Sequence, residues 1–133
     1  MLEGIVAVIA RDERVLVIRR SREVPFPDYW CPVSGKIEPG EEQETAVARE
    51  VREELGIEAS PLRKVWECPS SDGAYRLHWW TVELADETAA LVLDPREVSD
   101  ARWIRPAELR TFDNVFEADV KFFEEIWLTV RDR

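Results

Sequence analysis

The sequence predicts a single mixed α/β (α+β) domain over residues 1–133, and three observations support that prediction. Short apolar or alternating runs, such as those at 4–10 and 74–84, are typical of strands. Two longer segments carry apolar residues at helical spacing, and Gly and Pro gather in the connections between them. A chain of 133 residues is also long enough to bury one hydrophobic core.

The first elements are two apolar strands followed by a loop. GIVAVIA (4–10) and RVLVIRR (14–20) flank a polar turn, which predicts a hairpin of buried strands. Residues 21–40 contain four prolines and two glycines, so we expect this segment to be loop-rich.

The first helix is expected over residues 43–55. Val47, Val51 and Leu55 recur every four residues and form an apolar stripe. Gly56 follows directly, and glycine is the residue that most readily ends a helix in a left-handed conformation.

The second half of the chain predicts a strand pair, a further strand and a final helix. Residues 62–69 and 74–84 flank the polar turn SSDG, which indicates a second hairpin. ARWIR (101–105) reads as another strand, and Pro106 favours a short helical turn after it. Residues 114–130 place apolar side chains at three- and four-residue steps, which predicts an amphipathic C-terminal helix.

Composition excludes several classes of function. The formal net charge is −10, so the surface repels nucleic-acid backbones and anionic lipid, and we expect no nucleic-acid or membrane partner. An anionic small molecule remains a candidate ligand, because a bound metal cation makes the local charge positive.

No secretory signal or membrane span is visible, which favours a cytoplasmic protein. Cys31 and Cys68 lie far apart in a chain with one histidine, so we expect two free buried thiols rather than a zinc site.

An acidic cluster ends the first predicted helix. Glu50, Glu53 and Glu54 share one helix face, with the small Ala46 between them. Like charges repel, and the C-terminal end of a helix is unfavourable for anions. Helical spacing alone leaves two alternatives, which are a solvated acidic face and a set of ligands for a hard divalent cation.

The flanking residues distinguish these alternatives. The segment GKIEPGEEQETAVAREVREELGI (35–57) resembles the signature box of the Nudix hydrolase family, G-x5-E-x7-R-E-U-x-E-E-x-G-U, where U is a bulky aliphatic residue. Every specified position of this motif is filled. The matching residues are Gly35, Glu41, Arg49, Glu50, Val51, Glu53, Glu54, Gly56 and Ile57. The order of predicted strands around the box is also similar to the family's, so the MutT-like resemblance spans almost the whole chain.

The resemblance implies a fold and a chemistry. It implies a Nudix fold, an α/β/α sandwich with a mixed β-sheet, and hydrolysis of the pyrophosphate in a nucleoside diphosphate linked to another moiety. The implied cofactor is Mg²⁺ or Mn²⁺, which would neutralise the anionic substrate.

The resemblance also assigns roles to individual residues. By position, Glu50, Glu53 and Glu54 match the family's metal ligands, and the carbonyl of Gly35 matches a further ligand. Glu41 would support the loop or reach the metal through water. One more residue of the box, Arg49, matches the arginine that orients a glutamate.

Other candidate residues lie near or outside the box. Lys36 follows the box glycine and is a candidate phosphate contact, with a solvated surface lysine as the alternative. The general base is either a box glutamate or a distant acid, and Glu97 is the outside candidate, with an ordinary loop acid as the alternative. His78 lies in an alternating strand, so we expect a structural or substrate-lining role rather than a base.

Aromatic residues are candidates for holding the rest of the substrate. Six tryptophans are present, and Trp30 and Trp80 are candidate stacking residues, although a strand tryptophan more often fills the core. The chain departs from the family's usual Pro-Gly-Gly before the lysine, because residues 32–35 read Pro-Val-Ser-Gly. This departure concerns the geometry at the entrance of the site.

Two other functions compete with hydrolysis of a small nucleotide or other diphosphate. A Nudix-fold nucleotide-binding or sensor module without catalysis is one, although such proteins usually have a damaged box. A plain acidic scaffold domain is the other. Many family members form dimers, and the sequence leaves a homodimer open.

Overall fold

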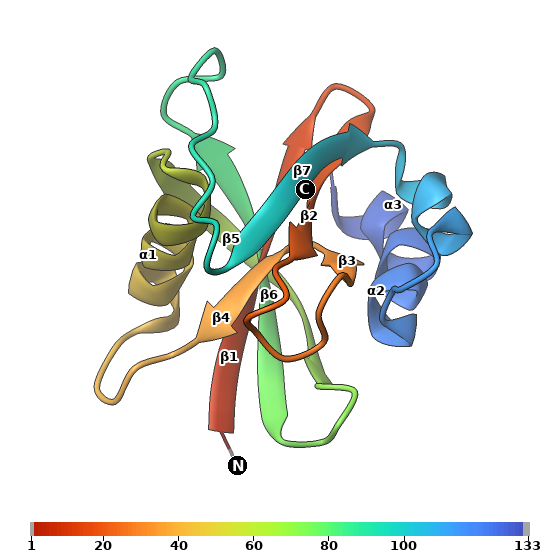
Figure 1. Cartoon of the computed structure of the whole chain (residues 1–133), viewed down its shortest axis with the longest axis horizontal. Coiled ribbons are helices and arrows are strands. Elements are labelled where there is room, and N and C mark those ends of the chain that lie inside the picture. The colour runs from red at the N-terminus through yellow and green to blue at the C-terminus, as the bar shows by residue number, and fades with distance from the viewer. Residues whose placement is uncertain (1, 132–133) are drawn as a thin grey trace.

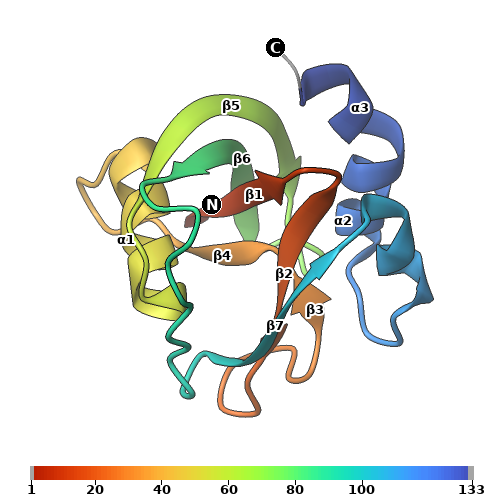
Figure 2. The same ribbon diagram turned by 90° about the horizontal axis from the view of Figure 1, so that it is seen from above.

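A mixed β-sheet lies between two helical layers in the computed structural model, which describes residues 2–131 (Figure 1). Helix α1 (Gln43–Leu55) covers one side, and the helical segments after β7 (Val98–Ile104) cover the other, as the view from above also shows (Figure 2). The predicted α/β/α sandwich with a mixed sheet is therefore confirmed.

Strand β1 (Leu2–Arg11) is the centre of the sheet. It runs parallel to β6 (Tyr75–Leu84) and antiparallel to β4 (Val33–Lys36). Beyond Ala10 it pairs with β2 (Arg14–Arg20), so the expected first hairpin is present but short. The predicted second hairpin is confirmed, because β5 (Ala59–Pro69) pairs antiparallel with β6.

The segment expected to be loop contains two short strands. Strand β3 (Trp30–Cys31) pairs with β2, and β4 pairs with β1. The loop-rich prediction for this segment did not include these strands, which are only two and four residues long and are separated by Pro32. Runs this short carry too little periodicity to be recognised among prolines and glycines.

Alternation along β1 divides the core into two halves. Ile5, Ala7 and Ile9 face helix α1, whose apolar stripe is fully buried as predicted, while Val6 and Val8 face the C-terminal segments. Helix α1 ends as expected at Gly56, which has φ 65° and donates its N–H to the carbonyl of Arg52. The stripe therefore fixes which face of α1 carries the acidic cluster.

The C-terminal helix is interrupted by a π-helical segment. A 3₁₀ helix, η1 (Pro106–Thr111), follows β7, and the helix then begins at Glu117 rather than Asn114. Its parts are α2 (Glu117–Lys121), the π-helical segment η2 (Phe122–Ile126) and α3 (Trp127–Val130). Phe122 and Phe123 are both buried, and Phe122 stacks on Trp79 at 4.3 Å between ring centroids. The π-helical turn, which is wider than a turn of α-helix, coincides with this aromatic packing.

Cys31 and Cys68 are both free and buried, as predicted. Among residues 2–131, every helix is too short or too polar to cross a lipid bilayer.

Candidate active site

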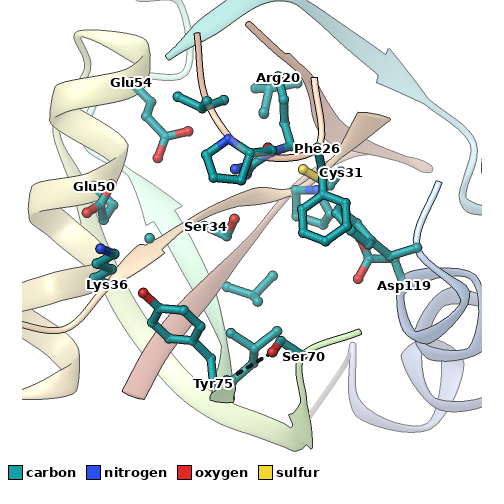
Figure 3. Close-up of a pocket in the computed structure, with 18 of the residues that line it drawn as sticks. Arg20, Phe26, Cys31, Ser34, Lys36, Glu50, Glu54, Ser70, Tyr75 and Asp119 are labelled. Atoms are coloured by element: carbon teal, nitrogen blue, oxygen red, sulfur yellow. Dashed lines mark hydrogen bonds between the residues drawn. The ribbon is translucent and has the colours of Figure 1, made fainter. Parts of the chain in front are cut away.

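A cavity of about 550 Å³ lies beside helix α1, over the sheet face formed by β1, β4 and β6 (Figure 3). Carboxylates from α1 form one side of it, and residues of the β2–β3 loop and α2 form the opposite side. The turn between β5 and β6 closes the third side. This volume is in the range of sites that bind small molecules.

Two carboxylates of α1 face each other at the edge of this cavity. Glu54 is 4% exposed although it carries a titratable group, and Glu50 lies one turn before it. The two carboxyl groups interact directly, so the charge on one disfavours the charge on the other. Burial raises the pKa of both carboxyl groups above the usual value for glutamate, and the mutual repulsion of the pair adds to this shift at Glu54. A pair of this kind favours a bound cation, whose charge offsets the repulsion between the two carboxylates.

Glycine at position 35 is required for the position of Glu50. A Cβ atom on residue 35 would overlap the carboxyl group of Glu50, so any other residue would force that carboxyl group out of its present position. The carbonyl of Gly35 and the Glu50 carboxylate are thereby brought to the same edge of the cavity.

We expect Gly35→Ala to weaken Mg²⁺ binding about tenfold to a hundredfold, because the added methyl group displaces Glu50. Calorimetric titration of the purified variant with Mg²⁺ measures the change. The melting temperature serves as the control for folding, since Gly35 has no positive φ that alanine would strain. Unchanged Mg²⁺ affinity would show that this contact does not position a ligand.

Arg49 joins three glutamates to the backbone of β4. Its guanidinium donates to both carboxylate oxygens of Glu41 (2.8 and 2.9 Å), to Glu50 (2.9 Å) and to Glu53 (3.2 Å). It also donates to the carbonyl of Lys36 at 2.9 Å. These hydrogen bonds lower the pKa of Glu41 to about 2. Glu41 is not among the residues that line the cavity, so its contact is with Arg49.

Glu97 is brought to the acidic cluster although it lies far along the chain. The loop before β7 is hydrogen-bonded to the end of α1, from Val92 N to the carbonyl of Leu55 and from Asp94 N to that of Glu54. Glu97 lines the cavity with Glu53 and Glu54, and its charge contributes to the raised pKa of Glu54. Glu53 is the most exposed of the clustered acids, with 53% of its side chain accessible.

The opposite side of the cavity is aromatic and contains a buried acid. Phe26 and Phe116 line it, with their ring centroids 5.0 Å apart. Asp119 lies nearby, 6% exposed, and makes no side-chain hydrogen bond or ion pair within residues 2–131. Burial raises the pKa of Asp119 to about 7, against a smaller opposing effect of Arg20. An unpartnered polar group in such a position is available to a ligand.

Three of the residues proposed from the sequence to bind substrate do not line this cavity. Trp30 packs against Phe112, and Arg102 lies over its ring. Trp80 donates its Nε1–H to Gln43 at the start of α1. His78 lies between Glu3 and Glu67 on the sheet face that carries α1. None of the three reaches this cavity, because alternation along the strand directs each side chain away from it.

Sequence reasoning did not identify Arg20, Cys31, Phe26, Tyr75 or Asp119, all of which line the cavity. For Asp119 a signal was present. It lies three residues after Phe116 and four before Phe123, so an acid occupies the apolar face of the final helix.

The residues present fit a hard divalent cation. The donor set consists of carboxylates together with a nearby backbone carbonyl, which are the oxygen ligands that Mg²⁺ and Mn²⁺ prefer. Within residues 2–131, no three His, Cys, Asp or Glu side chains are already arranged as a complete metal-binding group. The fit therefore depends on the Glu50–Glu54 pair and on the close approach of Gly35.

The fold and this site define a class of protein in which a carboxylate-bearing helix stands beside a ligand-sized cavity on a mixed sheet. The family model for the NUDIX domain matches residues 2–126, so the chain belongs to the NUDIX family. This confirms the resemblance stated from the box at residues 35–57.

Two curated relatives have named activities. Over 60 residues the chain is 43% identical to the CTP pyrophosphohydrolase of Escherichia coli (strain K12), covering 45% of this chain and 44% of that protein. It is 33% identical over 102 residues to the NAD-capped RNA hydrolase NudC of Stutzerimonas stutzeri, covering 75% of this chain and 35% of that protein. The chain thus spans less than half the length of either relative.

Solved structures extend the likeness to the whole fold. The solution structure of the E. coli ORF135 protein has a TM-score of 0.77 at 30% identity, covering 99% of this chain and 91% of that one. A crystal structure of a MutT protein from Methanosarcina mazei Go1 has a TM-score of 0.82 at 21% identity, covering 99% and 96% of the two chains. The second likeness concerns the fold alone.

Proposed function

We propose that the chain is a Mg²⁺- or Mn²⁺-dependent hydrolase that cleaves the pyrophosphate bond of a nucleoside diphosphate linked to another moiety. The observation that carries this proposal is the buried Glu50–Glu54 pair at the edge of a cavity of about 550 Å³. Family membership and the named activities of the curated relatives support the same chemistry.

Glu50, Glu53, Glu54 and the carbonyl of Gly35 are the proposed metal ligands. When bound there, a divalent ion would neutralise phosphate charge and activate the attacking water. Arg49 is a positioning residue, since its hydrogen bonds fix Glu50 and Glu53 relative to β4. Glu41 acts through Arg49, with which it forms a two-pronged ion pair.

The attacking water needs a base close to the acidic cluster. Glu53 and Glu97 are the two candidates, because both line the cavity and Glu53 has most of its side chain exposed to solvent. Lys36 lines the same side and would contact the phosphates of the substrate.

The nucleoside end of the substrate would occupy the opposite side of the cavity. Phe26 and Phe116 offer ring faces to a base, and Asp119 offers a carboxyl group that is protonated below a pH of about 7. A protonated carboxyl group both donates and accepts, which suits the edge of a nucleobase. This division of the cavity, with phosphate at one end and base at the other, supports a nucleotide as substrate.

The proposal is tested by turnover on a substrate panel. Pure protein with Mg²⁺ or Mn²⁺ is incubated with nucleoside triphosphates, dinucleoside polyphosphates, ADP-ribose, NADH and nucleotide sugars. We expect cleavage of at least one nucleotide class and loss of all turnover with EDTA. Tight nucleotide binding without cleavage of any substrate would instead identify a catalytically silent binding module.

The panel should include a capped RNA. The acidic surface predicts that nucleic acid is not a partner, whereas one relative is named as an NAD-capped RNA hydrolase. Hydrolysis of NAD but not of NAD-capped RNA would agree with the charge argument.

We expect Glu97→Gln to lower kcat about tenfold to a hundredfold if Glu97 is the base, with Mg²⁺ affinity unchanged. The pH dependence of kcat would also lose its acidic limb. Glu58→Gln, at an exposed position just beyond α1, is the control. A Glu97→Gln variant with full activity would assign the base to Glu53.

A further inference from the structure

Ser21 is a buried polar residue that the proposed mechanism does not yet use. It follows the last residue of β2, only 3% of it is exposed, and it lies outside the cavity lining. A buried hydroxyl makes its hydrogen bonds within the protein, so the partners of Ser21 indicate what it does.

The hydrogen bonds of Ser21 join two loops that are distant in the sequence. Its hydroxyl donates to the carbonyl of Arg96 at 2.7 Å, and its N–H donates to the carbonyl of Glu97 at 3.0 Å. The same hydroxyl accepts the N–H of Glu23 at 3.2 Å. Ser21 therefore connects the β2–β3 loop, which carries Phe26, to the β6–β7 loop, which carries Glu97.

The β6–β7 loop has a second attachment at helix α1. Asp94 donates its N–H to the carbonyl of Glu54 at 3.3 Å, and its own carbonyl accepts the N–H of Glu97 at 2.9 Å. In Figure 2 this part of the chain passes α1 and then meets β2 at the start of β7. Glu97 thus lies between an attachment to the helix that carries the acidic cluster and an attachment to Ser21.

The position of Glu97 depends on these two attachments. Residues 85–97, all of which the structure describes, connect β6 to β7 without a helix or strand of their own. A loop segment that is held at one end only opens more readily than one held at both. A general base must stay within hydrogen-bond reach of the attacking water, and a small displacement lowers the rate steeply.

We propose that Ser21 is a positioning residue that holds Glu97 at the acidic cluster. It acts through the backbone of residues 96 and 97 and does not touch the substrate. Through Glu23 the same hydroxyl holds the start of the β2–β3 loop, so it also fixes Glu97 relative to the side of the cavity that carries Phe26. This inference rests on the proposed hydrolase function and assigns the base to Glu97.

Steady-state kinetics of Ser21→Ala test the proposal. We expect kcat to fall about three- to tenfold, which is the effect of losing one buried hydrogen bond that orients a reacting group. The KM and the Mg²⁺ affinity should stay within about twofold, because the cavity lining and the acidic cluster are unchanged. Ser99→Ala is the matched control, since the exposed Ser99 donates its hydroxyl to the carbonyl of Arg19 at 3.4 Å and lies outside the cavity lining.

A double-mutant cycle with Glu97→Gln separates positioning from a purely structural effect. If Ser21 acts through Glu97, Ser21→Ala should lower kcat less than twofold in the Glu97→Gln protein. The loss of stability on urea unfolding should instead be the same in both backgrounds. An equal three- to tenfold loss of kcat in both backgrounds, or no loss in either, would overturn the inference.

Amide hydrogen exchange measured by NMR gives a readout that needs no turnover. In Ser21→Ala the amides of Glu23 and Glu97 should exchange at least threefold faster, while that of Val51 in α1 should not change. If wild type cleaves no nucleotide, the hydrolase proposal fails, and this exchange result alone supports the attachment of Glu97 by Ser21. Unchanged exchange at Glu97 would overturn the inference. If wild type is active and Glu97→Gln keeps full activity, hydrolysis stands and the role of Ser21 fails.

Discussion

Glu54→Gln should lower kcat/KM for hydrolysis by about 10³, equivalent to about 4 kcal/mol of transition-state stabilisation. The amide keeps the size of the side chain but removes the charge that a divalent cation needs at this point. Because Glu54 faces Glu50, the change also removes one half of the pair at the edge of the cavity. Saturable Mg²⁺ binding should weaken together with activity.

The same variant should be more stable than wild type when no metal is present. Burial raises the pKa of Glu54 in the folded protein well above 4.5. A group of this kind contributes stability that is complete below its unfolded pKa and is lost as pH rises through the folded pKa. Wild type loses that contribution as pH rises, whereas glutamine has no proton to lose.

Urea unfolding at pH 8 in EDTA, beside kinetics in Mg²⁺, measures both effects. Glu44→Gln is the matched control, since Glu44 is exposed on the first turn of the same helix and lies outside the cavity lining. Glu44→Gln should change neither the free energy of unfolding nor kcat/KM appreciably. A Glu54→Gln variant that gains stability but keeps full activity would show that Glu54 is not a metal ligand needed for hydrolysis.

The acidic helix could be predicted from sequence because several local signals agree there. The stripe of Val47, Val51 and Leu55, the ending at Gly56 and the filled box all fix the same register of one helix. Helical geometry then places Glu50 and Glu54 beside the stripe without any knowledge of the rest of the fold. Only the partial burial of that face needed the structure.

The other end of the cavity could not be predicted because it is assembled from distant segments. Phe26 comes from a loop after β2, Tyr75 from a strand and Asp119 from the last helix. Strand alternation showed that His78 and Trp80 share one face, but not which face meets the ligand. The answer depends on which face of the sheet is covered by α1. In the structure α1 covers the face that carries His78 and Trp80, so the opposite face meets the cavity.

The two ends of the cavity share one electrostatic property. Glu54 and Asp119 are both buried acids with raised pKa values, and Arg20 is the cation whose charge opposes the shift at each of them. One guanidinium does not offset the burial of two carboxyl groups, so the pKa values at both ends of the site stay raised. Stability near neutral pH is therefore reduced where substrate and metal are proposed to bind, which is common in active sites.

Asp119→Asn should remove a large part of the pH dependence of stability between pH 4 and pH 8. The pKa of Asp119 is raised from 3.8 to about 7, chiefly because the carboxyl group is buried. Below pH 3.8 both the folded and the unfolded chain hold the proton, so no free energy is lost. As pH rises toward 7, the unfolded chain loses its proton first, and the folded state becomes less stable by about 4 kcal/mol.

Chemical unfolding of wild type and Asp119→Asn at intervals of pH from 4 to 8.5 measures this effect. Asparagine resembles the protonated acid in size and hydrogen bonding, so the variant should match wild type near pH 4 and exceed it increasingly up to about pH 7. Other buried acids, Glu54 among them, contribute to both curves and cancel in the difference between them. Asp113→Asn, at an exposed position before the same helix, controls for the loss of one surface charge. Parallel curves for wild type and Asp119→Asn would mean that Asp119 is ionised in the folded protein at neutral pH, and that it meets a ligand as an anion.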